Sequence, residues 1–172
     1  MRALFGVALE LVALAIVVYV ASVLARWYPF SVLILLLAQA LTTILVHCPA
    51  HYVVGRMLGI KFSRIGMGRS TVSRALPAYL ERLGSLIVVF TLTVNPESKK
   101  NASSARLRAM FLAGVTGSVG SALTFAYVVS LEVSYMVGII TWVFAIVYLA
   151  SDVLFSPRAG DLMRARAVVS GP

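Results

Sequence analysis

Two histidines, His47 and His51, are the residues of this chain whose type and spacing point most directly to chemistry. They are the only histidines in the sequence, and they lie four residues apart in a run of apolar residues. On a helix this spacing puts both imidazoles on one face, about one turn apart, where two nitrogens can bind one metal ion. In the alternative interpretation, each histidine hydrogen-bonds a neighbouring helix or a backbone carbonyl that Pro49 leaves without its N–H partner.

Glu10 and Cys48 are further candidates for chemistry beside this pair. Glu10 is the only charged residue in the apolar run 3–25, roughly 10 Å from its start at about 1.5 Å per residue, and His47 lies at a similar depth in its own run. If the two runs pack together, Glu10 could supply a carboxylate; otherwise it is a protonated glutamate or hydrogen-bonds a histidine. Cys48 is about 60° round the helix from His51, so it is either a thiolate ligand of the same metal or a small buried apolar side chain.

The composition shows which elements must carry these residues. Of the 172 residues, 60% are hydrophobic and 12% are charged, and the mean hydropathy is +0.96. A soluble fold of this size cannot bury so much apolar surface, which excludes a soluble enzyme, a disordered tail and a disulfide-stapled secreted module. The chain is therefore predicted to be an integral, multi-pass membrane protein.

Four apolar segments are long enough to cross roughly 30 Å of hydrocarbon. They are residues 3–25, 31–55, 109–131 and 133–151. Arg2 precedes the first segment, as in a signal peptide, but the apolar region is too long for one and no clear cleavage site follows. We interpret residues 1–172 as a single membrane domain, with a loop at 56–108 and a tail at 152–172.

The basic residues predict the orientation of these spans. The chain has 15 Lys and Arg against 6 Asp and Glu, and with four spans every Lys and Arg except Arg26 falls on one side. By the positive-inside rule, both termini and the 56–108 region are cytoplasmic. The basic surface there is expected to bind anionic lipids rather than nucleic acid.

The 56–108 region contains two segments with strand character. Residues 60–68 alternate apolar with polar or small residues, and residues 86–94 form a β-branched run that is too short to span. The expected fold is an all-α membrane protein with four transmembrane helices and a short cytoplasmic-side β-hairpin between spans two and three.

Three segments resemble one known family. "HCPAHYVVGRMLGIKFSRIGMG" resembles the zinc-binding segment of the site-2 proteases, which are intramembrane metalloproteases with the usual form His-Glu-x-x-His. "RLRAMFLAGVTGSVGSALTFAYV" is similar to the third helix of that family, with Val115 in place of proline and Ser118 in place of asparagine. "SDVLFSPRAGDLMRAR" resembles the motif N-x-x-P-x-x-x-x-D-G-G-R, with Asp161 and Arg164 at their family positions.

The resemblance implies a zinc site and a peptide partner. His47, His51 and Asp161 would coordinate zinc, with Asp152 as the alternative third ligand. The hairpin would hold a transmembrane or juxtamembrane protein segment as an added strand. Cys48 stands at the position of the general base, where a thiol is a poor substitute for a carboxylate. The protein is thus expected to be either a metalloprotease or a related binder that does not cut.

Two other classes of function remain open from the sequence. A small transporter or channel subunit would use intramembrane His and Glu and a proline-broken helix as an ion path. A lipid-binding scaffold would need only the basic middle region and no metal.

Overall fold

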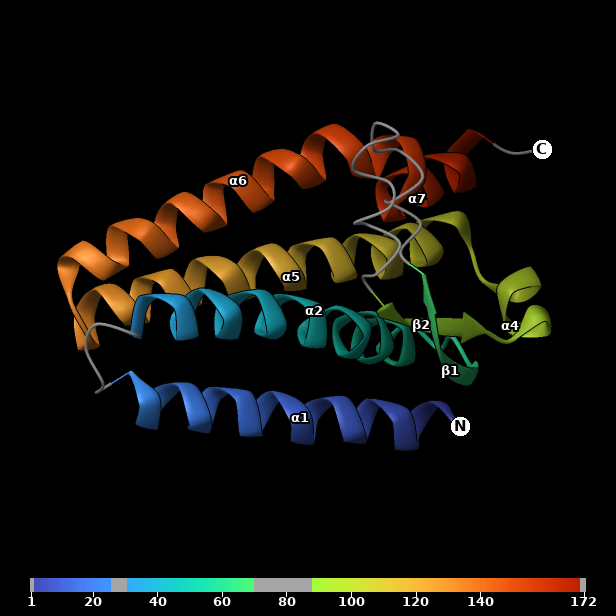
Figure 1. Cartoon of the computed structure of the whole chain (residues 1–172). Helices are drawn as coiled ribbons and strands as arrows, with labels where there is room; N and C mark the ends of the chain where they lie inside the picture. Colours follow the sequence, from blue (N-terminus) through green and yellow to red (C-terminus); the bar gives the residue numbers. More distant parts are fainter. Residues whose placement is uncertain (1, 26–30, 70–87, 171–172) are drawn as a thin grey trace.

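Four long helices dominate the computed structural model, which describes residues 2–25, 31–69 and 88–170 (Figure 1). They are α1 (Ala3–Leu24), α2 (Ser31–Met57), α5 (Ser104–Glu132) and α6 (Tyr135–Ala159). Each contains a stretch long and apolar enough to cross a membrane. The prediction of four long apolar helices, with a hairpin between the second and the third, is therefore confirmed. The orientation of these helices in a membrane stays a prediction.

Helix α5 extends beyond the predicted third span at both ends, and α6 extends beyond the predicted fourth span at its C-terminal end. The α5 helix begins at Ser104 because the hydroxyl of Ser103 accepts a hydrogen bond from the Arg106 N–H and caps the helix before the apolar residues start. The α6 helix runs eight residues beyond the predicted end at Ser151, since backbone hydrogen bonding does not require apolar side chains. The expected tail is thus largely helical, and Gly160 separates α6 from α7 (Asp161–Ser170).

The α2 helix lies at the centre of the bundle. It packs against α1 on one side and α5 on the other, and α5 in turn packs against α6 and α7. It continues through Pro49 without interruption, so the helix does not restart at the histidines. The side chain of Gln39 is buried in α2 and donates to the carbonyls of Ala122 and Thr141, which ties three of the spans together.

The predicted hairpin is confirmed. Its first strand begins at Phe62, two residues later than expected, and residues 86–87 of the second predicted strand lie outside the described residues. Strand β1 (Phe62–Arg69) pairs antiparallel with β2 (Val88–Val94), with Ile65 opposite Leu92 and Met67 opposite Phe90. Gly59 directs the chain into β1: its φ of 80° is a left-handed conformation that favours glycine. The N–H groups of Gly59 and Ile60 bond back to Arg56 and Gly55, which ends α2 in a Schellman motif.

One end of the bundle gathers the hairpin, the short helix α4 (Pro96–Asn101), α7 and both chain termini (Figure 1). Arg2 forms a β-bridge with Arg64, so the chain's own N-terminus covers part of the outer edge of β1. The α1 helix reaches the hairpin as well, because Gly6 lets it approach Ile65 closely. Strand β2 contacts α2, and its residues 90–94 line the same cavity as residues of α7.

Candidate metal centre

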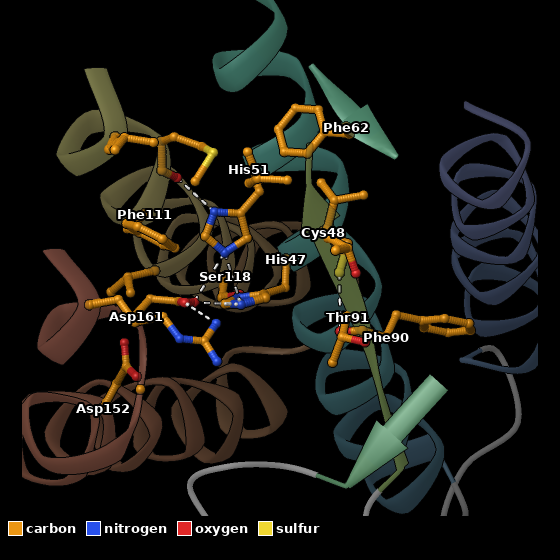
Figure 2. Close-up of a pocket in the computed structure, with 18 of the residues that line it drawn as sticks. His47, Cys48, His51, Phe62, Phe90, Thr91, Phe111, Ser118, Asp152 and Asp161 are labelled. Atoms are coloured by element: carbon orange, nitrogen blue, oxygen red, sulfur yellow. Dashed lines mark hydrogen bonds and ion pairs between the residues drawn. The ribbon is translucent and has the colours of Figure 1, made fainter. Parts of the chain in front are cut away.

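His47, His51 and Asp161 converge at the end of the bundle that carries the hairpin (Figure 2). The two histidines lie on one face of α2, as the spacing predicts, and Asp161 is the first residue of α7. Asp161 Oδ2 is 2.9 Å from His47 Nε2 and 3.0 Å from His51 Nε2, and the two Nε2 atoms are 3.2 Å apart. These three residues are the one group in the described part of the chain whose ligand atoms could hold a metal ion.

The spacing of these atoms suits a tetrahedral metal. Zinc bonds of about 2.0 Å at the tetrahedral angle separate neighbouring ligand atoms by about 3.3 Å. The observed separations of 2.9 to 3.2 Å are shorter by about 0.1 to 0.4 Å. A small outward movement of each side chain would therefore accommodate the ion.

Hydrogen bonds on the far side of each imidazole determine which nitrogen faces the site. His51 Nδ1 lies 2.6 Å from the carbonyl oxygen of Met110, which can only accept, so Nδ1 carries the hydrogen. His47 Nδ1 lies 3.0 Å from the hydroxyl of Ser118, which itself donates to the Thr43 carbonyl and so accepts from His47. Because Nδ1 carries a hydrogen in each ring, a neutral ring has Nε2 available for a metal ion on the side that faces Asp161. Two imidazole nitrogens and a carboxylate oxygen form a donor set that fits a metal such as zinc.

Asp161 is positioned by the turn between α6 and α7. Its place at the N-terminus of α7 is favourable for a carboxylate, and Arg164 Nη1 lies 3.4 Å from its second oxygen. Burial alone would raise the pKa of Asp161. The hydrogen bonds and charges of His47 and His51 outweigh burial and hold this pKa well below its usual range. The carboxylate is therefore ionised and ready to bind a cation.

The His51 ring is also fixed by its packing. It lies directly over Gly114 of α5, where a Cβ atom would overlap the ring, and it makes an edge contact with Phe111. The α5 helix therefore supplies both the hydrogen-bond acceptor and the space that His51 requires.

Cys48 and Glu10 are placed beside this group rather than in it. Cys48 is buried at 2% exposure, and its thiol donates to the Phe90 carbonyl of β2 at 3.2 Å. Of the two roles that the sequence left open for Cys48, this position favours the small buried side chain. The alternative, a thiolate ligand of the metal, is not favoured because Cys48 is outside the ligand group. Glu10 is buried in α1, which packs against α2, and it is also outside the ligand group.

A cavity of about 790 Å³ opens in front of the three ligands. Its wall includes β2, Cys48, Tyr148 of α6 and Asp152, the alternative third ligand. Asp152 borders the cavity but does not belong to the ligand group. The geometry therefore favours Asp161 over Asp152 as the third metal ligand.

Several residues of the site were not identified from the sequence. From the sequence, Ser118 stands out only because it replaces the asparagine of the similar family, and nothing indicates that it contacts His47. Thr43 could have been found from its position one helical turn before His47. The Met110 carbonyl leaves no trace in the sequence, because any residue carries that group.

The chain was also compared with known proteins. No protein-family model, no curated protein and no solved structure matches it. The likeness to the site-2 proteases therefore rests on the three motifs in the sequence, and the function has to be argued from the site itself.

Proposed function

We propose that this protein is a zinc-dependent membrane metallopeptidase of the site-2 protease type, acting on transmembrane or juxtamembrane protein segments. The observation that carries the proposal is the group of two imidazole nitrogens and one carboxylate oxygen at the wall of a large cavity. Three protein ligands with space beside them are typical of catalytic zinc sites, whereas structural sites are closed by a fourth.

His47, His51 and Asp161 would hold the zinc ion. When bound, zinc polarises a peptide carbonyl and makes a water molecule more acidic. Ser118 and the Met110 carbonyl keep the two imidazoles in the tautomer that binds metal.

The edge of β2 is the surface on which the peptide would lie. The Asn95 N–H bonds to Lys61 of the β1 segment, and the Phe90 carbonyl points the other way, to Cys48. Backbone groups alternate along a strand, so Leu92 also offers its N–H and carbonyl on the cavity side. A peptide added there as a strand would be extended, and its amide bonds would be exposed to the metal site.

The cavity wall favours an apolar peptide. Aromatic and aliphatic side chains border it beside the metal ligands, namely Phe62, Phe90, Leu92, Met110, Phe111 and Val115. The site also lies at the hairpin end of four helices suited to a membrane, which favours a partner that itself spans or leaves a membrane.

Metal analysis is the first test of this proposal. Protein purified in detergent should contain one zinc per chain, and His47→Ala, His51→Ala and Asp161→Asn should each lose it. Asp152→Asn is the matched control and should keep its zinc. Wild-type protein without zinc, or zinc retained in all three ligand variants, would refute the metal site.

Cleavage of a single-span test substrate in proteoliposomes tests the catalytic part. Cleavage should stop on addition of a chelator and return with zinc. A second candidate function, peptide binding without cutting, is favoured by the thiol of Cys48, which is a poor proton acceptor. In that case a peptide crosslinked to β2 would stay intact in the zinc-loaded protein.

A further inference from the structure

The cavity in front of the metal ligands lies between β2 and α7. Strand residues 90–94 line it, and so do Asp161, Arg164 and Val168, which share one face of α7. Figure 2 shows Phe90 across the two histidines from Asp161. A peptide added to β2 as a strand would therefore also face α7.

These two elements run in the same direction away from the metal ligands. Strand β2 passes the ligands at Phe90, whose carbonyl accepts from Cys48, and α7 begins there with Asp161. Farther along, Val94 and Val168 pack against the same buried apolar cluster. The path from Phe90 to Val94 is roughly 13 Å at about 3.3 Å per residue, which an extended peptide covers in about four residues.

Lys99 and Arg164 are the cationic side chains that line this cavity in the described part of the chain. Lys99 belongs to α4, which follows β2 after Asn95, so it lies beyond the Val94 end of the strand. Arg164 lies one turn after Asp161; its side chain is 49% exposed and its Nη1 is 3.4 Å from the carboxylate. Lys99 is exposed and forms no ion pair with any described residue.

We propose that Lys99 and Arg164 bind carboxylate side chains of the peptide. The preferred substrates then carry Asp or Glu within about four residues of the cut, on the side that runs toward α4. This inference rests on the proposed function, which places the peptide on β2. Charges of opposite sign across an interface select the partner, because like charges brought together there are costly.

The acidic residues near the cavity do not occupy this position themselves. Asp161 belongs to the metal ligand group, and Asp152 lies on the far side of Asp161 from β2 (Figure 2). Glu97 of α4 does not line the cavity. A bound divalent ion would add further positive charge to the same space.

The chemistry that these two cations recognise is an anionic oxygen, which a lipid headgroup also carries. A strand edge and apolar side chains lie beside them in the cavity wall, including Leu92 and Val94. This combination favours an extended peptide, since a strand edge binds a peptide backbone and apolar pockets bind its side chains.

Binding of short probe peptides to the full chain in lipid nanodiscs tests this inference. The probes share an apolar β-branched core and have acetylated and amidated ends, and they carry either two Asp or two Asn residues before or after the core. Fluorescence anisotropy gives each Kd, with empty nanodiscs as the blank. Wild type should bind one of the Asp probes about tenfold more tightly than its Asn counterpart, and high salt should reduce this preference.

Matched variants assign the preference to the two cations. Lys99→Gln and Arg164→Gln should each reduce the preference for the Asp probe about threefold, and the double variant should abolish it. Lys100→Gln and Arg166→Gln are the controls, because these residues lie in the same two helices but do not line the cavity. Both controls should keep the wild-type preference.

Equal binding of the Asp and Asn probes by wild type would overturn this inference, as would equal losses in Lys99→Gln and Lys100→Gln. A preference that is present in phosphatidylcholine nanodiscs but disappears when phosphatidylserine is added would assign the cations to lipid headgroups instead.

Zinc analysis of the same samples separates this inference from the proposed function. Zinc-loaded protein without an Asp preference would refute the inference alone. An Asp preference in wild-type protein that binds no zinc would support the cationic subsite and refute the metal-dependent function.

Discussion

Replacing Gly114 by alanine should weaken metal binding by at least about 100-fold without unfolding the protein. A Cβ atom at position 114 would overlap three atoms of the His51 ring, so the imidazole must leave its place. His51 then loses its hydrogen bond to Met110 and its alignment with Asp161. The variant therefore disrupts the site although it changes no ligand.

The Gly114→Ala substitution should change zinc affinity much more than it changes the free energy of unfolding. Loss of the His51 hydrogen bond costs about 1 kcal/mol, and alanine is about 1 kcal/mol more favourable than glycine inside a helix, so the free energy of unfolding should change little. Withdrawing one of three ligands should weaken zinc binding by at least about 100-fold, or about 2.7 kcal/mol.

Gly120 provides the control, because it lies in the same helix and a Cβ there meets nothing within 4 Å. Gly120→Ala should leave zinc affinity unchanged and raise stability by up to about 1 kcal/mol. Zinc titration and thermal unfolding in detergent measure both quantities. Wild-type zinc affinity in Gly114→Ala would show that His51 does not bind the metal in the observed position.

Three further perturbations test the site and the bundle. Ser118→Ala removes the acceptor for His47 Nδ1 and should weaken zinc binding about tenfold in a competition titration, with Ser121→Ala as the neutral comparison. Removing zinc with a chelator should lower the melting temperature of wild type but not of Asp161→Asn, since only a protein that binds the ion gains stability from it. Equal decreases in melting temperature for both proteins would contradict Asp161 as a metal ligand. Gln39→Leu removes the two hydrogen bonds that link α2 to α5 and α6 and should destabilise the fold by about 1 to 3 kcal/mol while zinc affinity is retained.

Much of the fold follows directly from composition and pattern. The long uncharged segments predict the four spanning helices, because no soluble fold could bury them. The alternation at 60–68 and the β-branched run at 86–94 predict the hairpin, because neither segment can span. The register between the strands was not predictable, since it depends on how Gly59 ends α2 and where β1 therefore begins.

The metal site, like the fold, was predictable from the sequence only in part. The pairing of His47 with His51 was predictable because one helical turn brings them together whatever else the chain does. The approach of Asp161 was not, because 110 residues separate it from His51 and it depends on α6 continuing to Ala159 and α7 packing back onto α5. The resemblance to a family indicated Asp161, but spacing along the chain did not.

Local composition and periodicity along the sequence thus determined by themselves that this chain forms four helices long and apolar enough to cross a membrane, and that it presents two imidazoles on one helical face. Only the tertiary structure decided which carboxylate joins them, that Cys48 turns to the hairpin, and that Glu10 is buried in the bundle. The physical reason is that helical periodicity is a property of a few consecutive residues. Contacts between distant segments depend instead on how the helices pack and on the turns that join them.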